Sequence, residues 1–494
     1  MTRSGESDMT TGETFQLPIP IDPASKLPIY RQLYGWIRDA ILAGTLRPGR
    51  RLPSTRSMAM HLKISRIPVL GAYEQLIAEG YLQTMTGIGT HVAHQLPDDA
   101  RRPAHVARKP APAVSGPRPL SRRGEAVLRS REEAGLPSLG AFRVSLPALD
   151  HFPQAIWSKL VAHHARGLTR AAMAYGDQMG LPEFRQTIAD YLGASRAVRC
   201  DAWQILVTTG SQQALQLCAQ VLLDAGERVC IEDPGYPGAR NAFIAAGAEL
   251  LPVPVDAEGL DPAALPRNEA VRAVYVTPSH QYPLGITMSA PRRLALLNWA
   301  ESVGAWIVED DYDSEYRYGN RPIASLQGID ATERVIYVGT FSKVMFPALR
   351  LGYMAIPKDL VAIFAAARET ADNFSSTLYQ LAMNDFIRQG HFGRHLRRMR
   401  MLYMERRRML IRALPAGLEV IGSEAGLHLV AMLPDGLDDL AVAKRARDAG
   451  LSVIPLSSCC VQKPKRGGLI LGFGGIGEAQ IKEGVAKLAS ILSD

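Results

Sequence analysis

From residue 335 to residue 352 the chain reads VIYVGTFSKVMFPALRLG. Residues 335–339 form an apolar run with the length of one buried β-strand, and a polar segment that contains Lys343 follows directly. Arg350 comes seven residues after this lysine. Because open α/β sheets bind ligands at the carboxyl ends of their strands, we expect Lys343 and Arg350 to lie in a binding site.

Apolar strands alternate with helical patterns in the sequence around this stretch. Strands are predicted at residues 203–208, 228–232, 273–277 and 306–309, and helices at residues 212–223, 239–247 and 292–303. The alternation begins near Phe142 and favours a mostly parallel sheet with helices on both faces. Residues 142–494 are therefore predicted to form an α/β body within a multi-domain chain.

The chain has 494 residues, too many for one small core, and a formal net charge of +8. Much of this charge lies near the N-terminus, where residues 26–93 hold nine Lys/Arg against three Asp/Glu. A small basic module is typical of proteins that bind the phosphate backbone of nucleic acids. Residues 94–140 are rich in Arg, Pro and Ala without a sustained apolar period, which predicts a flexible or partly extended linker.

The composition also argues against several classes of protein. No uncharged apolar stretch has the length of a membrane span, and the first residues lack a signal-peptide run, so we expect a cytoplasmic protein. Five scattered cysteines fit a reducing compartment. Cys459 and Cys460 have no partners at metal-ligand spacing, so no metal site is predicted.

The basic module of residues 26–93 has the pattern of three short helices and a hairpin. Apolar residues recur at helical spacing from Ile29 to Ile41, and this helix is expected to end near Gly44. The second helix is expected to begin at Ser54 or Thr55, either of which is a good N-cap. Its predicted buried face consists of Met58, Met60 and Leu62.

The third helix is predicted to follow the cap Ser65, to run to Glu79 and to close at Gly80. The turn Thr86-Gly87-Ile88-Gly89 then joins two short strands, and its glycines permit the positive φ of a hairpin. Free N–H groups at the start of the third helix suit phosphate and base-edge contacts in a major groove. A three-helix packing or dimerisation module with solvated arginines is the alternative.

This module resembles the GntR-type winged helix over nearly its whole length, through LPIY at 27–30, GRRLPSTR at 49–56, AYEQL at 72–76 and EGYL at 79–82. The resemblance implies DNA contacts from Arg51, Ser54, Thr55, Arg56, Ser65, Arg66 and Gly89. Ile67-Pro68 departs from the Asn-Thr that usually follows the recognition arginine. Proline is tolerated in a first helical turn, so we expect the helix to form with a different base specificity.

The strand ends of the body offer what pyridoxal phosphate chemistry requires, namely a lysine, an acid for the pyridine nitrogen and a phosphate cradle. Burial beside a cofactor cation lowers the pKa of Lys343 and makes it a competent imine former. Arg350 can hold the phosphate bidentately. Asp310 is assigned to the pyridine nitrogen and Tyr312 to the ring 3-oxygen. A metal site or a solvated loop is the alternative reading of the acidic run.

Further cofactor contacts are predicted from two turns. Gly210, Ser211 and Gln212 stand at a predicted helix N-terminus, which is a ready phosphate site. Tyr236 follows an Asp-Pro-Gly turn from which its ring can stack on the cofactor. Taken singly, the first segment is no stronger than any Gly-Ser turn, and Tyr236 is equally suited to be a core aromatic.

Together these segments resemble fold-type I aminotransferases over about residues 142–494, with further matches at AYGD (174–177), GLP (180–182) and TPSHQYPLG (277–285). The resemblance implies a small C-terminal α+β subdomain. It also implies a dimer in which Tyr175 reaches the phosphate of the neighbouring subunit, and it places Thr340, Ser342 and His280 at the cofactor.

A winged GntR head followed by this body resembles the MocR/GabR class of bacterial regulators. The resemblance implies a homodimeric, pyridoxal 5'-phosphate-dependent transcriptional regulator of double-stranded DNA. It would sense an amine or amino acid through an external aldimine formed in place of the Lys343 linkage. Two alternatives stay open: a genuine aminotransferase that its head localises on DNA, and a DNA-binding protein whose body is a cofactor-free dimerisation scaffold.

The chain departs from working aminotransferases at two positions. Tyr282 stands where those enzymes have the asparagine that tunes the ring oxygen, and Ile470 stands where an arginine clamps the substrate carboxylate. A bidentate clamp is hard to replace. We therefore expect a ligand that is held differently, or an arginine that arrives from elsewhere in the chain.

Overall fold

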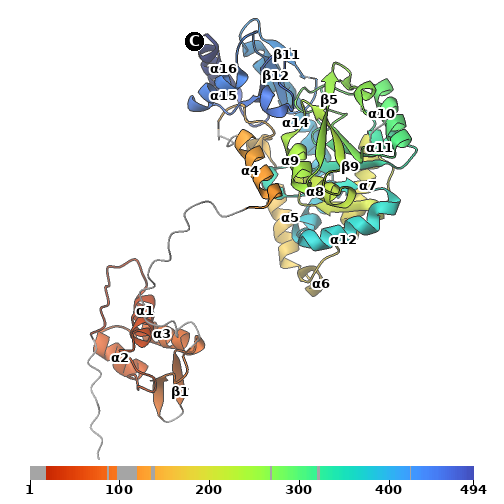
Figure 1. Ribbon diagram of the computed structural model, residues 1–494. Coiled ribbons are helices and arrows are strands. Elements are labelled where there is room, and N and C mark those ends of the chain that lie inside the picture. Colours follow the sequence, from red (N-terminus) through yellow and green to blue (C-terminus); the bar gives the residue numbers. More distant parts are fainter. Residues whose placement is uncertain are drawn as a thin grey trace, which may run out of the picture. The chain divides into compact units, whose positions relative to one another are not determined.

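The structure is a computed structural model that describes residues 18–85, 88–96, 120–134, 140–267, 270–319, 323–422 and 424–493. The chain splits into two compact units, Met1–Arg118 and Pro119–Asp494, and each is described by itself (Figure 1). Among the described residues, no helix combines the length and the apolar character that a bilayer span requires.

The N-terminal unit contains the three helices and the hairpin that the sequence predicts. Its elements are α1 Ile29–Leu42, α2 Thr55–Leu62, α3 Arg66–Ala78, β1 Leu82–Met85 and β2 Gly89–Val92. The two strands pair antiparallel. Gly44 and Gly80 follow α1 and α3 with positive φ values of 75° and 80°, which is why both helices stop there. Thr86 and Gly87 of the expected turn lie outside the described residues.

One prediction about α2 is wrong. Met58 is fully buried, but Met60 is 68% exposed and Ala59 is buried instead. Successive residues of an α-helix are separated by about 100°, so Met60 points almost opposite to Met58. A face made of residues 58, 59 and 62 satisfies the helical spacing.

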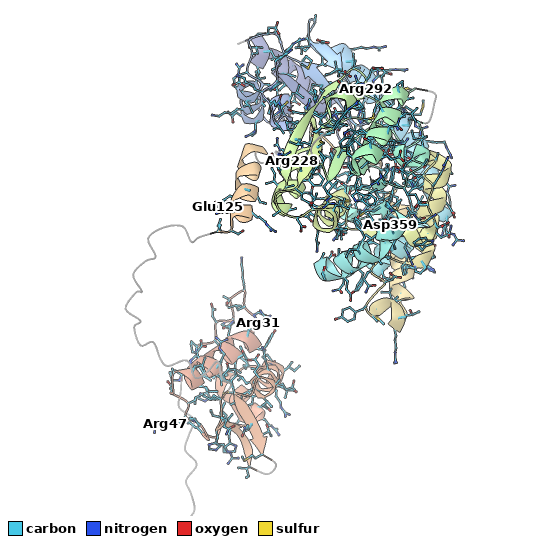
Figure 2. The ribbon with its side chains drawn as sticks, turned by 45° about the vertical axis from the view of Figure 1, so that its right-hand side comes forward. Arg31, Arg47, Glu125, Arg228, Arg292 and Asp359 are labelled. Carbon is cyan, nitrogen blue, oxygen red and sulfur yellow. The ribbon has the colours of Figure 1, made fainter. Side chains whose placement is uncertain are left out.

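The segment predicted as a linker contains a helix. Within the part of residues 94–140 that the structure describes, α4 spans Arg122–Ala134 and packs against α9, Pro237–Ala246, of the body (Figure 1). Its sequence is dominated by charged residues such as Glu125, labelled in Figure 2. This composition hid a helix whose stability comes from packing on a neighbour.

An eight-stranded sheet forms the centre of the body. Its order is β3-β10-β9-β8-β7-β4-β5-β6, in which the strands from β9 to β5 run parallel and β10 is antiparallel to both of its neighbours. The strands are β3 Ile205–Thr208, β4 Arg228–Asp233, β5 Glu249–Asp256, β6 Gly259–Leu260, β7 Ala273–Val276, β8 Trp306–Asp311, β9 Val335–Thr340 and β10 Gly352–Ala355.

Helices cover both faces of this sheet, as the continuous apolar runs predict. Every residue of β9 is buried. Ile336 and Val338 pack with α8, α9 and α12 on one face, and Tyr337 packs with α7 and α13 on the other. The bounds of these and the other body helices are α5 Gln154–Arg166, α6 Arg170–Met173, α7 Pro182–Arg196, α8 Ser211–Leu222, α10 Ala290–Val303, α11 Leu326–Ile329, α12 Val361–Asp372 and α13 Thr377–Arg388.

The long helix α14, His391–Ala413, leads into the C-terminal α+β subdomain. Its four strands have the order β11-β12-β14-β13, with every neighbouring pair antiparallel. They are β11 Glu419–Ile421, β12 His428–Met432, β13 Ile454–Pro455 and β14 Gly468–Gly472, accompanied by α15 Asp439–Asp448 and α16 Glu478–Ser493.

Candidate cofactor site and DNA-binding head

The carboxyl ends of β7, β8 and β9 bring several predicted residues together. The Tyr312 hydroxyl lies 3.0 Å from His280 Nδ1. The charge of Asp310 acts on Lys343 across the same space. These residues come from three neighbouring parallel strands, and the edge at which they meet is the edge that the sequence analysis indicated.

Lys343 is the nucleophile candidate. Its Nζ atom donates a hydrogen bond of 3.4 Å to the Ser145 carbonyl oxygen. Burial lowers the pKa of Lys343 to about 8, against the opposing charges of Asp313 and Asp310, and Arg143 lowers it further. A lysine with this pKa is neutral for an appreciable fraction of the time at physiological pH, as a nucleophilic amine has to be.

Asp310 is the penultimate residue of β8, and one of its carboxylate oxygens is hydrogen-bonded while, within the described part of the chain, the other is not. Its Oδ2 atom accepts a hydrogen bond of 2.9 Å from the Tyr275 hydroxyl. Its Oδ1 atom is buried without a partner among the described residues. Burial raises the pKa of Asp310 to about 7. Such an oxygen fits the protonated ring nitrogen of a bound pyridine, which would supply the missing donor.

The start of α8 fits a phosphate group. Gly210 is the N-cap of this helix with φ +127°, and a Cβ atom there would lie 3.5 Å from Arg350 Nη1. The free N–H groups of the first turn and the Arg350 guanidinium therefore share one small space beside Ser211. Gln212 is occupied elsewhere, because its side-chain amide donates to the Gly238 carbonyl oxygen at 3.0 Å.

Thr340 and Ser342 shape the turn that carries Lys343. The Ser342 backbone N–H donates to Thr340 Oγ1 at 3.2 Å. Thr340 is the last residue of β9 and is buried, whereas Ser342 is half-buried. Both residues thus hold the turn, whatever further contact they make with a ligand.

Two aromatic side chains of the site, Tyr236 and Tyr282, are in contact with each other. The rings of Tyr236 and Tyr282 meet edge to face with centroids 5.3 Å apart. Burial raises the pKa of Tyr282 well above its ordinary value, so the Tyr282 hydroxyl is neutral. Burial, followed by the charge of Asp310, raises the pKa of Tyr236 to about 12, and this side chain is therefore neutral.

Sequence reasoning missed Asp313. Its Oδ1 atom lies 2.8 Å from His280 Nδ1, and its Oδ2 atom accepts from the Leu427 backbone N–H at 3.2 Å. An ionised carboxylate only accepts hydrogen bonds, so His280 Nδ1 carries the ring proton and donates a hydrogen bond to Asp313 Oδ1. The Tyr312 hydroxyl consequently keeps its proton for another acceptor, as contact with a ring oxygen requires.

His428 of β12 was also missed. Its ring lies 5.2 Å from that of His280, and its Nε2 atom hydrogen-bonds the Pro283 carbonyl oxygen at 3.0 Å. Burial lowers the pKa of His428 to about 4, so the ring is neutral near pH 7. No sequence signal identifies His428, because it lies on a strand far along the chain from the motifs.

Tyr175 is not brought to these residues by its own chain. It is 88% exposed, and its ring contact is with Phe374 at 6.3 Å. A role at the cofactor would require a second copy of the chain.

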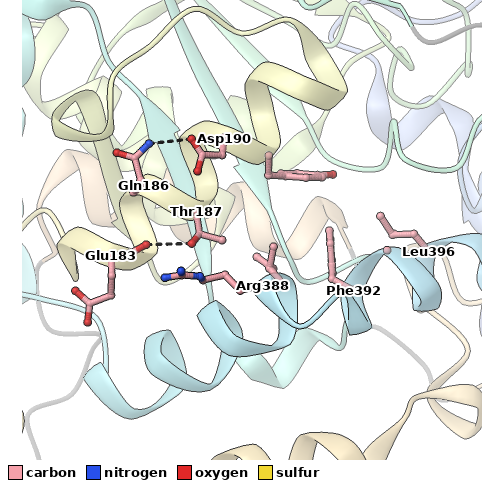
Figure 3. A pocket seen from close by; sticks show the side chains of 11 residues that line it. Glu183, Gln186, Thr187, Asp190, Arg388, Phe392 and Leu396 are labelled. Atoms are coloured by element: carbon pink, nitrogen blue, oxygen red, sulfur yellow. Dashed lines mark hydrogen bonds between the residues drawn. The ribbon is translucent and has the colours of Figure 1, made fainter.

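A cavity of about 660 Å³ lies elsewhere on the body, between α7 and the corner where α13 meets α14 (Figure 3). Gln186 donates to Asp190 at 2.8 Å along its rim, and Thr187 donates to the Glu183 carbonyl oxygen at 3.1 Å. None of the predicted cofactor residues lines it. This cavity is therefore separate from the site around Lys343.

The residues expected to contact DNA lie at two helix starts of the head. Ser54 caps α2 by accepting the Ser57 backbone N–H at 3.1 Å. Arg66 opens α3, and its Nε atom donates to Thr55 Oγ1 at 3.1 Å. Ser65 caps α3 by position, but its side chain makes no capping hydrogen bond.

Of the other predicted DNA contacts, Arg51 and Arg56 are exposed and Gly89 of the wing is half-buried. The Arg51 guanidinium lies at the wing, where a Cβ atom on Gly89 would be 3.2 Å from Arg51 Nε. Arg51 and Arg56 are both exposed, and Figure 2 shows Arg31 and Arg47 as two further arginines of this unit. A largely unpaired basic surface around a short hairpin suits a phosphate backbone.

Two family profiles match the chain. The profile described as aminotransferase class I and II covers residues 148–488, and the one described as bacterial regulatory proteins, gntR family, covers residues 29–92.

Curated relatives resemble the chain over nearly its full length. A probable rhizopine catabolism regulatory protein, MocR, of Rhizobium meliloti is 40% identical over 95% of both chains. A pyridoxine biosynthesis transcriptional regulator, PdxR, of Corynebacterium glutamicum is 33% identical over 97% of this chain and 99% of its own. A transcriptional regulator, TauR, of Rhodobacter capsulatus is 34% identical over 96% and 100%.

Solved structures match the body. The α-aminoadipate aminotransferase LysN of Thermus thermophilus, complexed with N-(5'-phosphopyridoxyl)-L-leucine, aligns with a TM-score of 0.67 and 29% identity over 76% of this chain and 95% of its own. An archaeal alanine:glyoxylate aminotransferase aligns with a TM-score of 0.70 and 25% identity over 76% and 98%.

Proposed function

The chain belongs to the GntR family of bacterial transcriptional regulators, in the MocR-type subfamily that carries an aminotransferase-like body, and from this membership we propose how it senses its signal. It is a DNA-binding regulator whose cofactor is pyridoxal 5'-phosphate. The proposal is that a primary amine, binding at Lys343, changes how a homodimer of the chain holds promoter DNA in the cytoplasm.

The observation that carries this proposal is the unpaired Oδ1 atom of Asp310, buried in the same site as a lysine whose pKa is about 8. An unpaired buried carboxylate oxygen is costly, and it is retained where a ligand satisfies it. When bound, the cofactor supplies an aldehyde carbon that reacts reversibly with primary amines.

We assign the roles from this geometry. Lys343 holds the cofactor covalently, and Asp310 binds its ring nitrogen. Tyr312 donates to its ring oxygen, because His280 Nδ1 directs its own hydrogen bond to Asp313. Tyr236 stacks on the ring. The phosphate is bound by residues at two turns, Gly210, Ser211, Thr340, Ser342 and Arg350, with Gln212 supporting the first turn. Tyr175 completes the cradle from the other subunit.

The head binds double-stranded DNA through the exposed surface around α3 and the wing. We propose contacts from Arg51, Ser54, Thr55, Arg56, Ser65, Arg66 and Gly89. Ser65 supports this assignment, because its hydroxyl stands at a helix start without an internal capping role.

Sensing follows from competition at Lys343. A bound cofactor would supply an aldehyde carbon for which the effector amine and the Lys343 nitrogen would compete, and the Lys343 nitrogen lies within the field of Asp310 and Asp313. The free and the linked lysine favour different arrangements of the surrounding residues. An effector with unequal affinity for the two states shifts their populations, and the head is the readout.

We do not propose an enzyme as the main function. The relatives named above that span both units are regulators, whereas the aminotransferases align with the body alone. The position of the substrate-carboxylate arginine is occupied by Ile470.

The test is one titration with two readouts. Purified protein loaded with the cofactor is titrated with a panel of amines while the visible absorption of the cofactor and the anisotropy of labelled upstream DNA are followed. We expect at least one amine to change both signals, and Lys343→Ala to lack the lysine-dependent absorption. DNA binding that no amine alters, in protein whose absorption does respond, would contradict sensing.

A further inference from the structure

The side of the site that faces the C-terminal subdomain is apolar. Ile470 is fully buried in the middle of β14, opposite Val430 of β12 and Ile454 of β13. Tyr236 and Tyr312, both assigned to the cofactor, pack against the same buried cluster. We call this cluster the apolar wall, and it consists of Tyr282, Leu284, Val430, Leu456, Cys459 and Ile470.

The ionisable side chains of the wall, and His428 beside it, are neutral. Burial raises the pKa of Cys459 to about 12, and its Sγ atom lies 4.0 Å from the Ser458 hydroxyl oxygen. His428, next to Val430 on β12, has a pKa lowered to about 4 and hydrogen-bonds a backbone carbonyl oxygen. The wall therefore presents no positive charge at neutral pH.

The charges on the other sides of Lys343 are mainly negative. Asp313 and Asp310 both act to raise the pKa of Lys343. The charge of Arg143 lowers the pKa of Lys343, and Arg143 is half-buried on the segment that contributes the Ser145 carbonyl oxygen. An anionic group brought to the wall would meet these two carboxylates. The nearby cations are Arg143 and Arg240, and the Arg240 guanidinium already donates to the Cys460 and Ser458 carbonyl oxygen atoms at 3.1 and 3.3 Å.

In the aminotransferases that the body resembles, an arginine stands at the position of Ile470. That arginine clamps the substrate carboxylate, which lies on the carbon that bears the reacting nitrogen. Here a carboxylate at that place would lose its water against Ile470 without an ion pair in return, and this loss is unfavourable. We propose, building on the sensing function above, that the effector is a primary amine whose nitrogen-bearing carbon carries no carboxylate.

Matched pairs that differ only by this carboxylate test the proposal. Cofactor-loaded protein is titrated with tyramine against tyrosine, cadaverine against lysine, and ethanolamine against serine, with the cofactor absorption as readout. In each pair that responds, we expect the amine to act at a concentration at least about tenfold lower than its amino acid.

Replacing Ile470 tests the wall directly. Ile470→Arg restores a guanidinium that can hold a carboxylate bidentately, so the preference within each pair should reverse towards the amino acid. Ile470→Leu conserves the volume and the apolar surface of the wall, and it should leave the preference unchanged. Both variants are compared at equal cofactor occupancy.

The variant Arg143→Gln tests the alternative that Arg143 binds the carboxylate of an amino acid. It places no charge in the core, so it is less liable to misfold than Ile470→Arg. Wild-type protein that binds the amino acids as well as the amines, and loses that binding in Arg143→Gln, would overturn the proposal, because Arg143 would then be the clamp. Equal effects of Ile470→Arg and Ile470→Leu would also overturn it. If no member of any pair alters the absorption of loaded protein, the sensing function fails, and this inference fails with it.

Discussion

At the scale of single residues, the site consists of charges that burial holds away from their usual protonation. The pKa of Lys343 is lowered from 10.5 to about 8 by burial, and that of Asp310 is raised from 3.8 to about 7 by the same cause. Both shifts favour the neutral form of a group that a bound cofactor would engage. The site is therefore poised for its ligand at a cost in stability when it is empty.

The lysine shift predicts a pH dependence. Only the neutral amine attacks an aldehyde, so the rate at which cofactor-free protein captures pyridoxal phosphate should rise with pH, reach half its maximum near pH 8 and level off about one pH unit higher. Stopped-flow absorption from pH 6 to 10 measures it, with Lys343→Ala as the control for surface lysines. A rate that still climbs steeply above pH 9 would show that Lys343 titrates like an exposed lysine.

The acid shift predicts a stability change with a definite sign. Between pH 3.8 and about 7, folded Asp310 keeps a proton that the unfolded chain has lost, so its contribution to stability falls as pH rises through this window. Asp310→Asn removes that penalty. At pH 8 the cofactor-free variant should be more stable by about 1–3 kcal/mol, and near pH 4 the two proteins should unfold alike.

The same variant should bind the cofactor at least about tenfold more weakly, because an amide cannot balance a protonated ring nitrogen. Thermal unfolding at the two pH values and an absorption titration together check both halves. A variant less stable than wild type at pH 8 would mean that the Asp310 carboxylate is well satisfied without a ligand.

At the scale of elements, the sequence predicts what repetition makes visible. Strands buried on both faces, such as β8 and β9, stand out as apolar runs, and α1 and α3 follow helical spacing and end at glycines. The short antiparallel β10 was missed because Gly352 and the preceding arginine break its apolar run. Helix α4 was missed because its neighbour, and not its own pattern, stabilises it.

Site residues follow a similar rule. Lys343 and Asp310 could be proposed from the sequence because Lys343 follows β9, Asp310 lies near the end of β8, and both residue types have distinctive chemical roles. Asp313 was not distinguished from its acidic neighbours, since only the folded loop shows which carboxylate faces His280. Met60 was misplaced because residues 58, 60 and 62 follow a spacing of two, whereas the buried face of α2 follows the helical spacing of residues 58, 59 and 62.

The two helix caps of the head predict separable effects. Ser54→Ala removes a capping hydrogen bond to Ser57 and should reduce the stability of the head by about 1 kcal/mol. Ser65→Ala removes a hydroxyl without a capping bond, so stability should change by less than about 0.5 kcal/mol while DNA affinity falls. Denaturant melts and DNA anisotropy distinguish the two. Equal losses of stability would assign Ser65 a structural role.

At the scale of the whole molecule, the exposure of Tyr175 predicts a shared site. Two variants, Lys343→Ala and Tyr175→Ala, are each expected to bind the cofactor weakly, and they are mixed so that subunits exchange. If Tyr175 serves the neighbouring subunit, each hybrid dimer contains one complete site, and tight cofactor binding should return at about one site per dimer. Absorption counts these sites. No recovery in hybrids whose formation is verified would mean that Tyr175 does not complete the site of the neighbouring subunit.

The joining of a head to a body predicts a reciprocal relation that contacts within either unit do not reveal. If an effector amine changes DNA affinity by some factor, thermodynamic linkage requires DNA to change the affinity for the amine by the same factor. Amine titrations with and without saturating upstream DNA, followed by the cofactor absorption, measure one side of this relation, and DNA anisotropy measures the other. We expect factors of about 5–150 that agree between the two experiments.

In Lys343→Ala the amine-dependent factor should fall to one while DNA binding itself persists, because the head keeps its own core. An amine that binds the body equally well with and without DNA would mean that the two units act independently.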